Sequence, residues 1–327
     1  MGASERMTVV TLADERYALT LAVLGRSLSE NSRSGRCATL YVVDGGIALE
    51  TKRHLIASWD PERILVEFVP PQFGEERELP VWGRLPPLTY ARVFVPLLVP
   101  EECRKAIMLD SDVVIQADIE RLWNVELGDR GVLAVQDPAV PFVSSKSGLR
   151  RYRELGIPAG HPYFNAGVMV INVEKWRRID VSGRVMEFIR GNADELNYCD
   201  QDGLNAILWN DWGALDSRWQ VQPRLVARVR VPMPQFDEGT RAQLTADPWI
   251  LHFSGRLKPW IYRDATLADR LFYEYLDRTW WSGWRPPSSV KAWMYRLYDS
   301  RLRDWCYPVE QWGHAAMRKL SRRSARV

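Results

Sequence analysis

The chain has 327 residues, of which 46% are hydrophobic and 26% are charged, and a formal net charge of +3. This length and composition indicate an ordinary globular protein with a sizeable core, built as one large domain or as two fused half-domains. The four cysteines form no CxxC pair, and the chain is too large for a disulfide scaffold, so a reducing compartment fits best. A charged start and short apolar runs make export and a membrane-spanning helix unexpected.

Positive charge is concentrated towards the end of the chain. Residues 284–327 contain ten Lys or Arg against three Asp or Glu, a net +7, which leaves −4 for residues 1–283. From Val290 on, apolar and aromatic residues recur at helical spacing among these cations, a pattern typical of a segment at a membrane surface. The alternative is a helix packed on the body with a solvated basic end. A nucleic-acid arm fits less well, because the body is acidic and aromatic residues interrupt the basic ones.

Strands and helices alternate in the first third of the chain. Four apolar runs are predicted to be strands, at 7–13, 39–44, 63–69 and 105–110. An amphipathic helix that begins at Tyr17 follows the first run, and a helical pattern over 47–58 follows the second. This order predicts an α/β protein with a mostly parallel sheet and helices on both faces. Further strands are predicted at 132–137, 166–172 and 249–254.

Long, weakly periodic stretches separate some of the later strands, as in residues 144–165. Stretches of this kind are usually functional lids or disordered linkers. The sequence has no internal repeat, no GxGxxG motif and no Walker loop, so nicotinamide and P-loop chemistry lose their usual support.

Two acidic residues, Asp110 and Asp112, follow the predicted strand 105–110, and Asp14 follows the first strand. Ligands of parallel sheets bind at the carboxyl ends of the strands. Like charges so close repel each other unless something positive lies between them, and a divalent cation is the obvious candidate. The alternative is a strand that simply ends in solvent. Such a pair arises by chance about once in a chain of this length, so it needs corroboration.

The corroboration comes from five further stretches that occur in one order along the chain. They are "LADERY" (12–17), "TYAR" (89–92), "YFNAGVMVINVEKWR" (163–177), "YCDQDGLNAI" (198–207) and "LHFSGRLKPW" (251–260). Together with the acid pair, they resemble the retaining glycosyltransferase family 8, which contains glycogenin and the bacterial lipo-oligosaccharide galactosyltransferases. The resemblance spans residue 7 to roughly residue 263.

The resemblance implies a GT-A domain over residues 1–283, with a nucleotide-sugar half of about 1–115 and an acceptor half of about 116–283, followed by the basic helical tail 284–327. It implies transfer of a hexose, glucose or galactose, from a UDP-sugar with retention of configuration. It also implies Mn²⁺, with Mg²⁺ as the other candidate, bound by Asp110, Asp112 and His252. Two carboxylates and an imidazole suit such a cation independently. A lone His in an apolar strand is more often a core residue, but its place in "HFSGRLKPW" reverses that expectation.

The resemblance also implies a set of residues that bind the nucleotide sugar. They are Ala13, Asp14, Tyr17, Arg92, Asp110, Ser111, Asp112, Asp137, Asn165, Ala166, Asp200, Gln201, Gly255 and Lys258. Some of them have structural alternatives: core packing for Tyr17, a turn for Asp137 and helix capping for the acids of "CDQD". Asp202 fits the capping role best, which leaves Asp200 and Gln201 for the site.

Gln201 and Asp200 are the predicted catalytic residues. An amide is a poor nucleophile, which favours a front-face mechanism stabilised by Gln201, and double displacement through Asp200 stays open. The acceptor is expected to be a glycan or a lipid-linked glycan. The protein is expected in the cytoplasm, attached peripherally to the inner face of the membrane through its basic tail. No nucleic acid is expected as a partner. The alternative function is a catalytically silent UDP-sugar or glycan-binding relative, although all three metal ligands are present.

Overall fold

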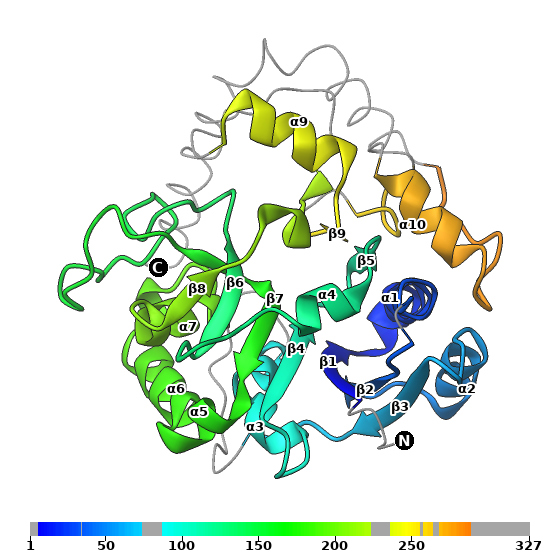
Figure 1. Ribbon diagram of the computed structural model, residues 1–327, viewed down its shortest axis with the longest axis horizontal. Coiled ribbons are helices and arrows are strands. Elements are labelled where there is room, and N and C mark those ends of the chain that lie inside the picture. Colours follow the sequence, from blue (N-terminus) through cyan, green and yellow to red (C-terminus); the bar gives the residue numbers. More distant parts are fainter. Residues whose placement is uncertain are drawn as a thin grey trace, which may run out of the picture.

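A seven-stranded sheet forms the centre of the protein in the computed structural model, which describes residues 6–33, 35–73, 87–223, 236–255, 258–263 and 268–288 (Figure 1). The strand order is β3-β2-β1-β4-β7-β6-β8. The strands are β1 Met7–Ala13, β2 Ala38–Asp44, β3 Ile64–Val69, β4 Lys105–Leu109, β6 Val132–Gln136, β7 Phe164–Asn172 and β8 Trp212–Ala214. Only β7 runs against its neighbours, so the sheet is mostly parallel, as the sequence predicts.

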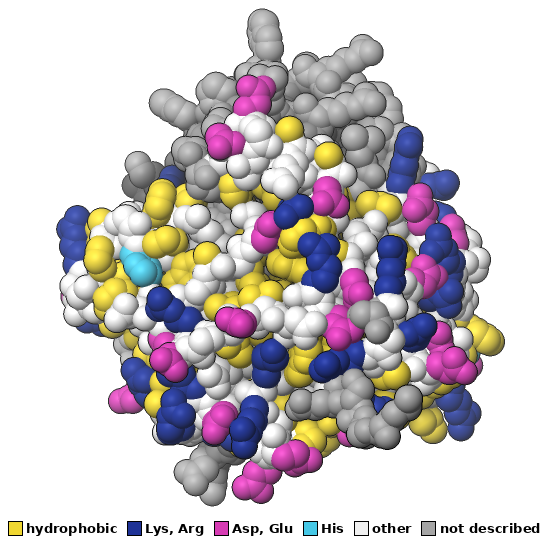
Figure 2. Space-filling view, in the orientation of Figure 1, with side chains coloured by type: hydrophobic (Ala, Val, Ile, Leu, Met, Phe, Trp, Pro, Cys, Tyr) yellow, Lys and Arg dark blue, Asp and Glu magenta, His cyan; other side chains and the backbone are white. Residues whose placement is uncertain are grey.

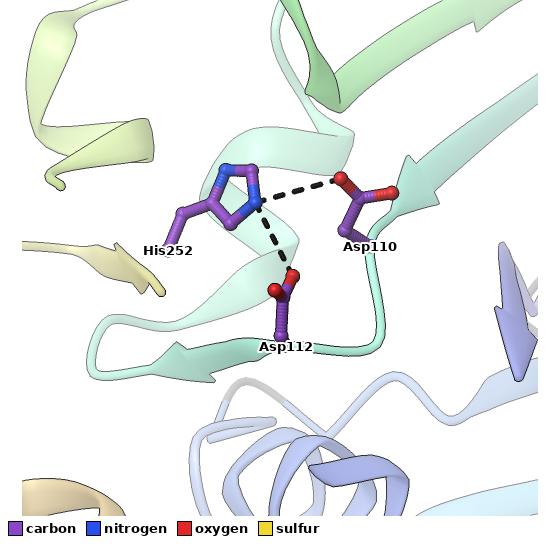
Figure 3. A group of neighbouring side chains, drawn as sticks. All are labelled: Asp110, Asp112 and His252. Atoms are coloured by element: carbon purple, nitrogen blue, oxygen red, sulfur yellow. Dashed lines mark ion pairs between the residues drawn. The ribbon is translucent and has the colours of Figure 1, made fainter. Parts of the chain in front are cut away.

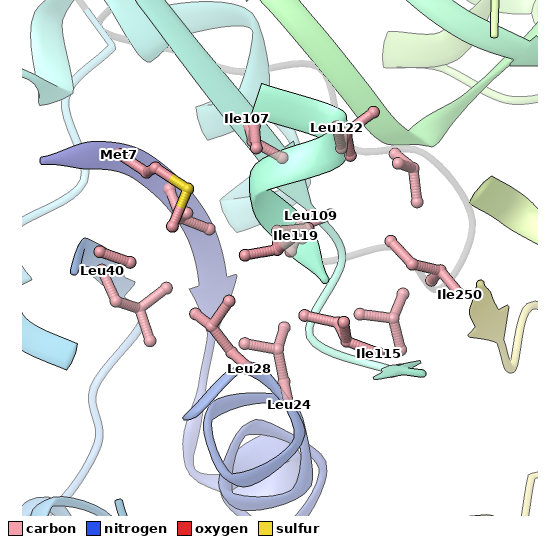
Figure 4. Packing of buried hydrophobic residues seen from close by; sticks show 14 of the residues in the cluster. Met7, Leu24, Leu28, Leu40, Ile107, Leu109, Ile115, Ile119, Leu122 and Ile250 are labelled. Atoms are coloured by element: carbon pink, nitrogen blue, oxygen red, sulfur yellow. The ribbon is translucent and has the colours of Figure 1, made fainter. Parts of the chain in front are cut away.

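Helices cover both faces of this sheet. Among the described residues, the α-helices are α1 Ala18–Glu30, α2 Leu49–Ala57, α3 Val95–Leu98, α4 Ile119–Trp123, α5 Val173–Arg178, α6 Val181–Gly191, α7 Asp200–Leu208, α9 Glu238–Ala246 and α10 Asp269–Leu276. The 3₁₀ helices are η1 Glu15–Tyr17, η2 Pro87–Phe94, η3 Ala193–Glu195 and η4 Ser217–Gln220. One face packs against α1, α2 and α4, and Figure 4 shows part of this core. The other face packs against η2, α3, α5, α6 and α7. Burial on both faces explains why the strands are almost continuously apolar.

The strand directions bring the predicted site residues to one edge of the sheet. β1, β4 and β6 end at this edge, and β7 begins there because it is antiparallel to β4 and β6. The pairing of β6 with β7 shifts from Ala134↔Met169 to Val135↔Asn165, so residues 166–168 form a bulge. The backbone N–H of Asp110 donates to the carbonyl of Gly167 in this bulge at 2.8 Å. The bulge therefore lies directly against the end of β4.

A second, smaller sheet consists of β5 Val113–Ile115 and β9 Ile250–His252, which the sequence did not predict as a separate sheet. Val113 pairs with His252 in antiparallel register. Val221 extends this sheet through an isolated parallel bridge to Leu251. One face of the small sheet joins the core under α1, and the other packs against α10. This sheet carries the histidine of the predicted metal set to the acid pair.

The described chain ends next to α10. Arg285 donates hydrogen bonds to both carboxylate oxygens of Asp277, at 2.8 and 2.7 Å, and Trp284 packs against the neighbouring core. The helical pattern predicted from Val290 on lies outside the described residues. In the described part of the chain, no helix has both the length and the apolar character needed to cross a bilayer.

Candidate active site

Asp110, Asp112 and His252 converge at the carboxyl end of β4 (Figure 3). The Nε2 atom of His252 lies 3.4 Å from Oδ2 of Asp110 and 3.2 Å from Oδ1 of Asp112. Asp110 follows β4, Asp112 precedes β5, and His252 ends β9, so three strand ends meet here. The pairing of Val113 with His252 fixes this alignment. The structure thus brings together the three residues that the sequence predicts as a metal set.

Two cationic side chains, Arg92 and Lys258, flank the acid pair. The sequence analysis had assigned both cations to binding of the nucleotide sugar. Arg92 places NH2 2.8 Å from Oδ1 of Asp110 and Nε 2.8 Å from Oδ2 of Asp200, and its NH1 donates to the carbonyl of Ala166 at 3.1 Å. Lys258 donates from Nζ to Oδ2 of Asp112 at 2.5 Å and to the carbonyl of Phe253 at 3.0 Å. Three carboxylates, those of Asp110, Asp112 and Asp200, thus face the two cations Arg92 and Lys258. The carboxylates outnumber the Arg and Lys cations, which leaves an excess of negative charge among these five side chains.

Burial and these partners shift the ionisation of the acids in opposite directions. Burial alone would raise the pKa of Asp112, but Lys258 and His252 outweigh it and hold this pKa well below its usual range. Burial dominates at Asp200 and, with the charge of Asp110, raises its pKa to about 6, although Arg92 acts in the opposite direction. Asp112 is therefore ionised at neutral pH, as a ligand of a hard cation must be.

The cluster fits a divalent metal ion on its own chemistry. One ligand atom from each of Asp110, Asp112 and His252 can be chosen so that all three lie within 4.8 Å of one another. Carboxylate oxygens with one imidazole nitrogen suit Mn²⁺ or Mg²⁺, and a divalent ion would offset the excess negative charge. Gly167 leaves the space for this arrangement, because a Cβ there would lie 2.2 Å from Cε1 of His252 and 2.9 Å from Oδ2 of Asp110.

A second group of polar side chains forms a connected network beside the acid cluster. Nδ2 of Asn165 and Nε2 of Gln201 both donate to Oδ2 of Asp137, at 2.7 and 3.1 Å. Oε1 of Gln201 accepts from the backbone N–H of Ala166 at 3.0 Å, and Oδ1 of Asn165 accepts from that of Gly167 at 2.8 Å. All of these side chains are buried. The amide of Gln201 is therefore held in one orientation, and Arg92 joins this network to the acid cluster through Ala166.

The start of α7 places Asp200 and Gln201 through an unusual backbone. Cys199, directly before the helix, has φ +52° and ψ −110°. Residues other than glycine rarely adopt this backbone conformation. Its thiol donates to the hydroxyl of Tyr90 at 2.8 Å. Both residues lie in motifs that the sequence analysis quotes, but it gives neither a role, and only the structure reveals their contact.

The predicted capping role of Asp202 is wrong. The helix begins at Asp200, so Asp202 lies inside its first turn. Its Oδ2 instead accepts the backbone N–H groups of Asn197 and Tyr198, at 2.5 and 2.7 Å, and its Oδ1 accepts the hydroxyl of Tyr163 at 2.7 Å. Asp202 thus fixes the turn before the helix.

The predicted nucleoside residues follow β1. Ala13 is buried at the end of the strand, and Asp14 caps η1 by accepting the backbone N–H of Arg16 at 3.0 Å. The guanidinium of Arg16 also pairs with Asp14 at 2.6 Å. Tyr17 packs against the core and makes an edge contact with Trp260, with ring centroids 6.2 Å apart. Tyr17 therefore has the packing role that the sequence analysis left open, while its ring also lies 5.9 Å from Nζ of Lys258.

The remaining predicted residues lie around the same edge. Ser111 is buried between the two acids, and Asp137 follows the end of β6. Gly255 follows β9 with φ +98°, a conformation that favours glycine.

Comparison with known proteins agrees with this arrangement. The model of glycosyl transferase family 8 matches residues 8–264, and the chain belongs to this family. General stress protein A of Bacillus subtilis (strain 168) is 29% identical over 291 residues, covering 86% of this chain and 97% of that protein. Glycosyltransferase 8 domain-containing protein 1 of Homo sapiens is 27% identical over 306 residues, covering 82% of this chain and 76% of that protein.

Solved structures extend the likeness to the fold. The galactosyltransferase LgtC, solved with donor and acceptor sugar analogues, superposes with a TM-score of 0.69 at 27% identity, covering 84% of this chain and 96% of that one. The bifunctional glycosyltransferase WbbM shares the fold with a TM-score of 0.71 at 21% identity, covering 91% of this chain and 53% of that one. The mixed α/β fold is thus similar to the GT-A fold of LgtC, and family and fold together support a glycosyltransferase that takes a sugar donor and a glycan acceptor.

Proposed function

We propose that the protein is a metal-dependent, retaining α-glycosyltransferase. It moves a hexose, glucose or galactose, from a UDP-sugar to a hydroxyl of a glycan or glycolipid acceptor. The observation that carries this proposal is the convergence of Asp110, Asp112 and His252 at the sheet edge, beside the polar network of Asp137 and Gln201. Similarity to the galactosyltransferase LgtC supports it.

The two carboxylates and the imidazole would hold Mn²⁺ or Mg²⁺, which would supply positive charge at the leaving diphosphate. Once the metal binds Asp112, the ammonium of Lys258 would be able to donate to a phosphate oxygen of the donor sugar. Like the carboxylate that it contacts now, a phosphate oxygen is an anionic acceptor. Arg92 would hold Asp110 and Asp200 in fixed positions through its fork of donors. Ser111 and Gly255 would let the backbone approach the diphosphate.

The polar network would receive the transferred sugar. Asp137, Asn165 and Asp200 would bind its hydroxyls, and Ala166 would lie against its ring. Gln201 would face the anomeric carbon, where an amide oxygen stabilises an oxocarbenium-like state. The fixed orientation of this amide favours a front-face mechanism, in which the departing diphosphate takes the proton of the acceptor hydroxyl. In the competing double displacement, Asp200 would be the nucleophile. Ala13, Asp14 and Tyr17 would hold the uracil.

We also propose the domain division and the location predicted from the sequence. Residues 1–283 would form the catalytic domain, with its nucleotide-sugar half at about 1–115, and residues 284–327 would attach the enzyme to the cytoplasmic face of an anionic membrane. Figure 2 shows one face of the described part of the chain. On the face shown, the coloured Lys and Arg side chains are interspersed with Asp and Glu, and no broad area of one sign is visible. The attraction to anionic lipid in this proposal would come from the ten Lys or Arg of residues 284–327.

A donor screen tests the proposed function. UDP release is measured with a panel of UDP-sugars, with Mn²⁺, with Mg²⁺ and with a chelator, for the wild-type chain, Asp112→Asn and the exposed control Asp129→Asn. We expect one UDP-hexose to be turned over with the metal only, by the wild type and the control but not by Asp112→Asn. UDP-sugar binding without turnover of any donor would instead identify a catalytically silent relative.

A further inference from the structure

Asn205 of α7 is a buried amide to which the proposed function gives no role. Its side chain is 1% exposed. Its Oδ1 accepts the backbone N–H of Phe164 at 2.8 Å, and its Nδ2 donates to the carbonyls of Phe164 and Gln201, at 2.8 and 2.9 Å. Because an N–H can only donate and a carbonyl can only accept, these partners fix the orientation of the amide. Asn205 thus connects α7 with the first residue of β7.

These hydrogen bonds lie along an edge of β7 that β4 does not reach. In the described part of the chain, the pairing of β4 with β7 ends at Val168, short of the first residues of β7. Phe164 and Ala166 are fully buried there, so their backbone groups need partners inside the protein. Asn205 is the partner at Phe164. Oε1 of Gln201 is the partner at Ala166, whose N–H donates to it at 3.0 Å.

The spacing of the two amides along α7 matches the spacing of the residues that they bind. Gln201 and Asn205 are four residues apart, which is a rise of about 6 Å along a helix. Phe164 and Ala166 are two residues apart in a strand, which is a distance of about 6.6 Å. The helix therefore binds the edge of β7 with two side chains at successive turns, where a neighbouring strand would use its backbone.

The register of α7 on β7 decides how the amide of Gln201 is held. Its Oε1 accepts from Ala166, and its Nε2 donates to Oδ2 of Asp137 at 3.1 Å. A shift of α7 along the strand would lengthen the bond to Ala166 and leave the amide free to turn. A misplacement of about 1 Å at a reacting centre can cost about 100-fold in rate. The contacts of Asn205 with Phe164 oppose such a shift.

We propose that Asn205 is a positioning residue for Gln201. By binding Phe164 and the carbonyl of Gln201 together, its amide holds α7 in the register in which Ala166 donates to Oε1 of Gln201. The inference rests on the proposed function, because this register matters for the reaction only if Gln201 faces the anomeric carbon.

Steady-state kinetics of donor hydrolysis by the full chain test this role. The variant is Asn205→Ala, in which water can fill the space of the amide and bond to Phe164. UDP release from the UDP-hexose that the wild type turns over gives kcat, and calorimetry gives the affinity for UDP in the presence of Mn²⁺. We expect kcat to fall about tenfold or more, because Gln201 is misplaced, while the affinity for UDP stays within about twofold of the wild type.

Asn31 provides a matched control for the loss of stability. It is 2% exposed, and its Nδ2 donates at 3.0 Å to the carbonyl of Ser27, also four residues earlier, and at 3.0 Å to that of Ile115 in β5. Asn31→Ala should therefore lower the melting temperature as Asn205→Ala does, but leave kcat at the wild-type value.

A double variant tests whether Asn205 acts through Gln201. In Gln201→Ala there is no amide left to position, so adding Asn205→Ala should slow the residual turnover by no more than about twofold. If Asn205→Ala does not fold, Asn205→Ser replaces it. A serine hydroxyl can bond to the carbonyl four residues earlier but is too short for Phe164, so the same loss of kcat is expected.

Wild-type kcat in the variant of Asn205 that folds would overturn the inference. An equal loss of kcat in Asn31→Ala, a parallel loss of UDP affinity, or a double variant about tenfold slower than Gln201→Ala would do the same, since each would mark the role of Asn205 as purely structural. With turnover by the wild type intact, these outcomes refute the role of Asn205 alone. A wild type that turns over no UDP-hexose refutes the proposed function, and the role of Asn205 with it.

Discussion

Gly167 illustrates how a residue without a side chain shapes the candidate site. It lies in the β7 bulge, between the ring of His252 and the carboxylate of Asp110, and its carbonyl accepts the backbone N–H of Asp110. Any Cβ at this position would overlap the imidazole. The space that lets a histidine approach two aspartates is therefore created by the backbone of a strand distant in sequence from all three.

Gly167→Ala should displace His252 from the acid pair. We expect Mn²⁺ affinity to fall at least tenfold, and the free energy of unfolding to fall by about 1–3 kcal/mol from overpacking. Calorimetric titration and urea denaturation measure the two effects. Gly160→Ala is the matched control, since a Cβ there meets nothing within 4 Å. Unchanged affinity in Gly167→Ala would mean that His252 does not need its position for metal binding.

Asp200 should make the stability of the metal-free protein depend on pH. Its pKa is about 6 in the folded protein against 3.8 as the reference value, mainly through burial. A raised carboxyl pKa means that the folded state holds the proton more tightly, so stability is lost as pH rises from about 4 to 6. Asp200→Asn cannot ionise. Relative to this variant, the wild type should lose up to about 3 kcal/mol over that window in urea denaturation. A difference that is constant with pH would contradict the assignment.

At the scale of elements, the first turn of α7 combines a strained backbone with two predicted catalytic residues. The conformation of Cys199 costs about 1–3 kcal/mol for a residue with a side chain. The hydrogen bond of Cys199 to Tyr90 and the ion pair of Arg92 with Asp200 hold η2 and α7 together across this turn. The strain thus lies where Asp200 and Gln201 are presented to the site.

Comparing Cys199→Gly with Cys199→Ala isolates this strain, because both variants lose the thiol and only glycine relaxes the backbone. Cys199→Gly should be more stable than Cys199→Ala by about 1 kcal/mol or more in urea denaturation. Inside α7, Ala206→Gly should show the opposite order and cost about 1 kcal/mol relative to alanine. Equal stability of the two Cys199 variants would show that the turn is not strained.

Elements that lie in long apolar or periodic runs could be predicted from the sequence, and two of the three shortest strands could not. The strand over 7–13 is confirmed, and those near 39–44, 63–69 and 105–110 agree to within a residue. β5 and β8 were missed, because three residues carry little periodic signal, whereas β9, which is as short, was predicted as part of the longer apolar run 249–254. The reversed direction of β7 and its bulge were also missed, since pairing with distant strands decides them.

The same distinction applies to the candidate site. Asp110, Asp112 and His252 could be predicted from their motifs, and the structure brings them together. The pairing of Lys258 with Asp112, of Arg92 with two acids and of Tyr90 with Cys199 could not, because each contact joins segments far apart in sequence.

At the scale of the whole molecule, the basic tail should decide membrane binding. The full chain should sediment with anionic vesicles at low salt, because each Lys or Arg near such a surface contributes about 1 kcal/mol. A chain truncated after residue 288 keeps the contacts of Trp284 and Arg285 with the body and should stay in the supernatant. Neutral vesicles serve as the control. If the full chain stays in the supernatant with anionic vesicles, the proposed membrane attachment is wrong and the tail has a structural role instead.

The anomer released by hydrolysis tests the central claim, a metal-dependent transfer with retention, most directly. Water can replace the unknown acceptor, so the wild-type chain is incubated with a UDP-α-hexose and Mg²⁺, a metal that does not broaden the NMR spectrum. Proton NMR then follows the first hexose to appear, before its α and β anomers equilibrate. The account predicts the α-hexose first, with no release in the presence of a chelator. Initial release of the β-hexose, or equal release without the metal, would contradict it.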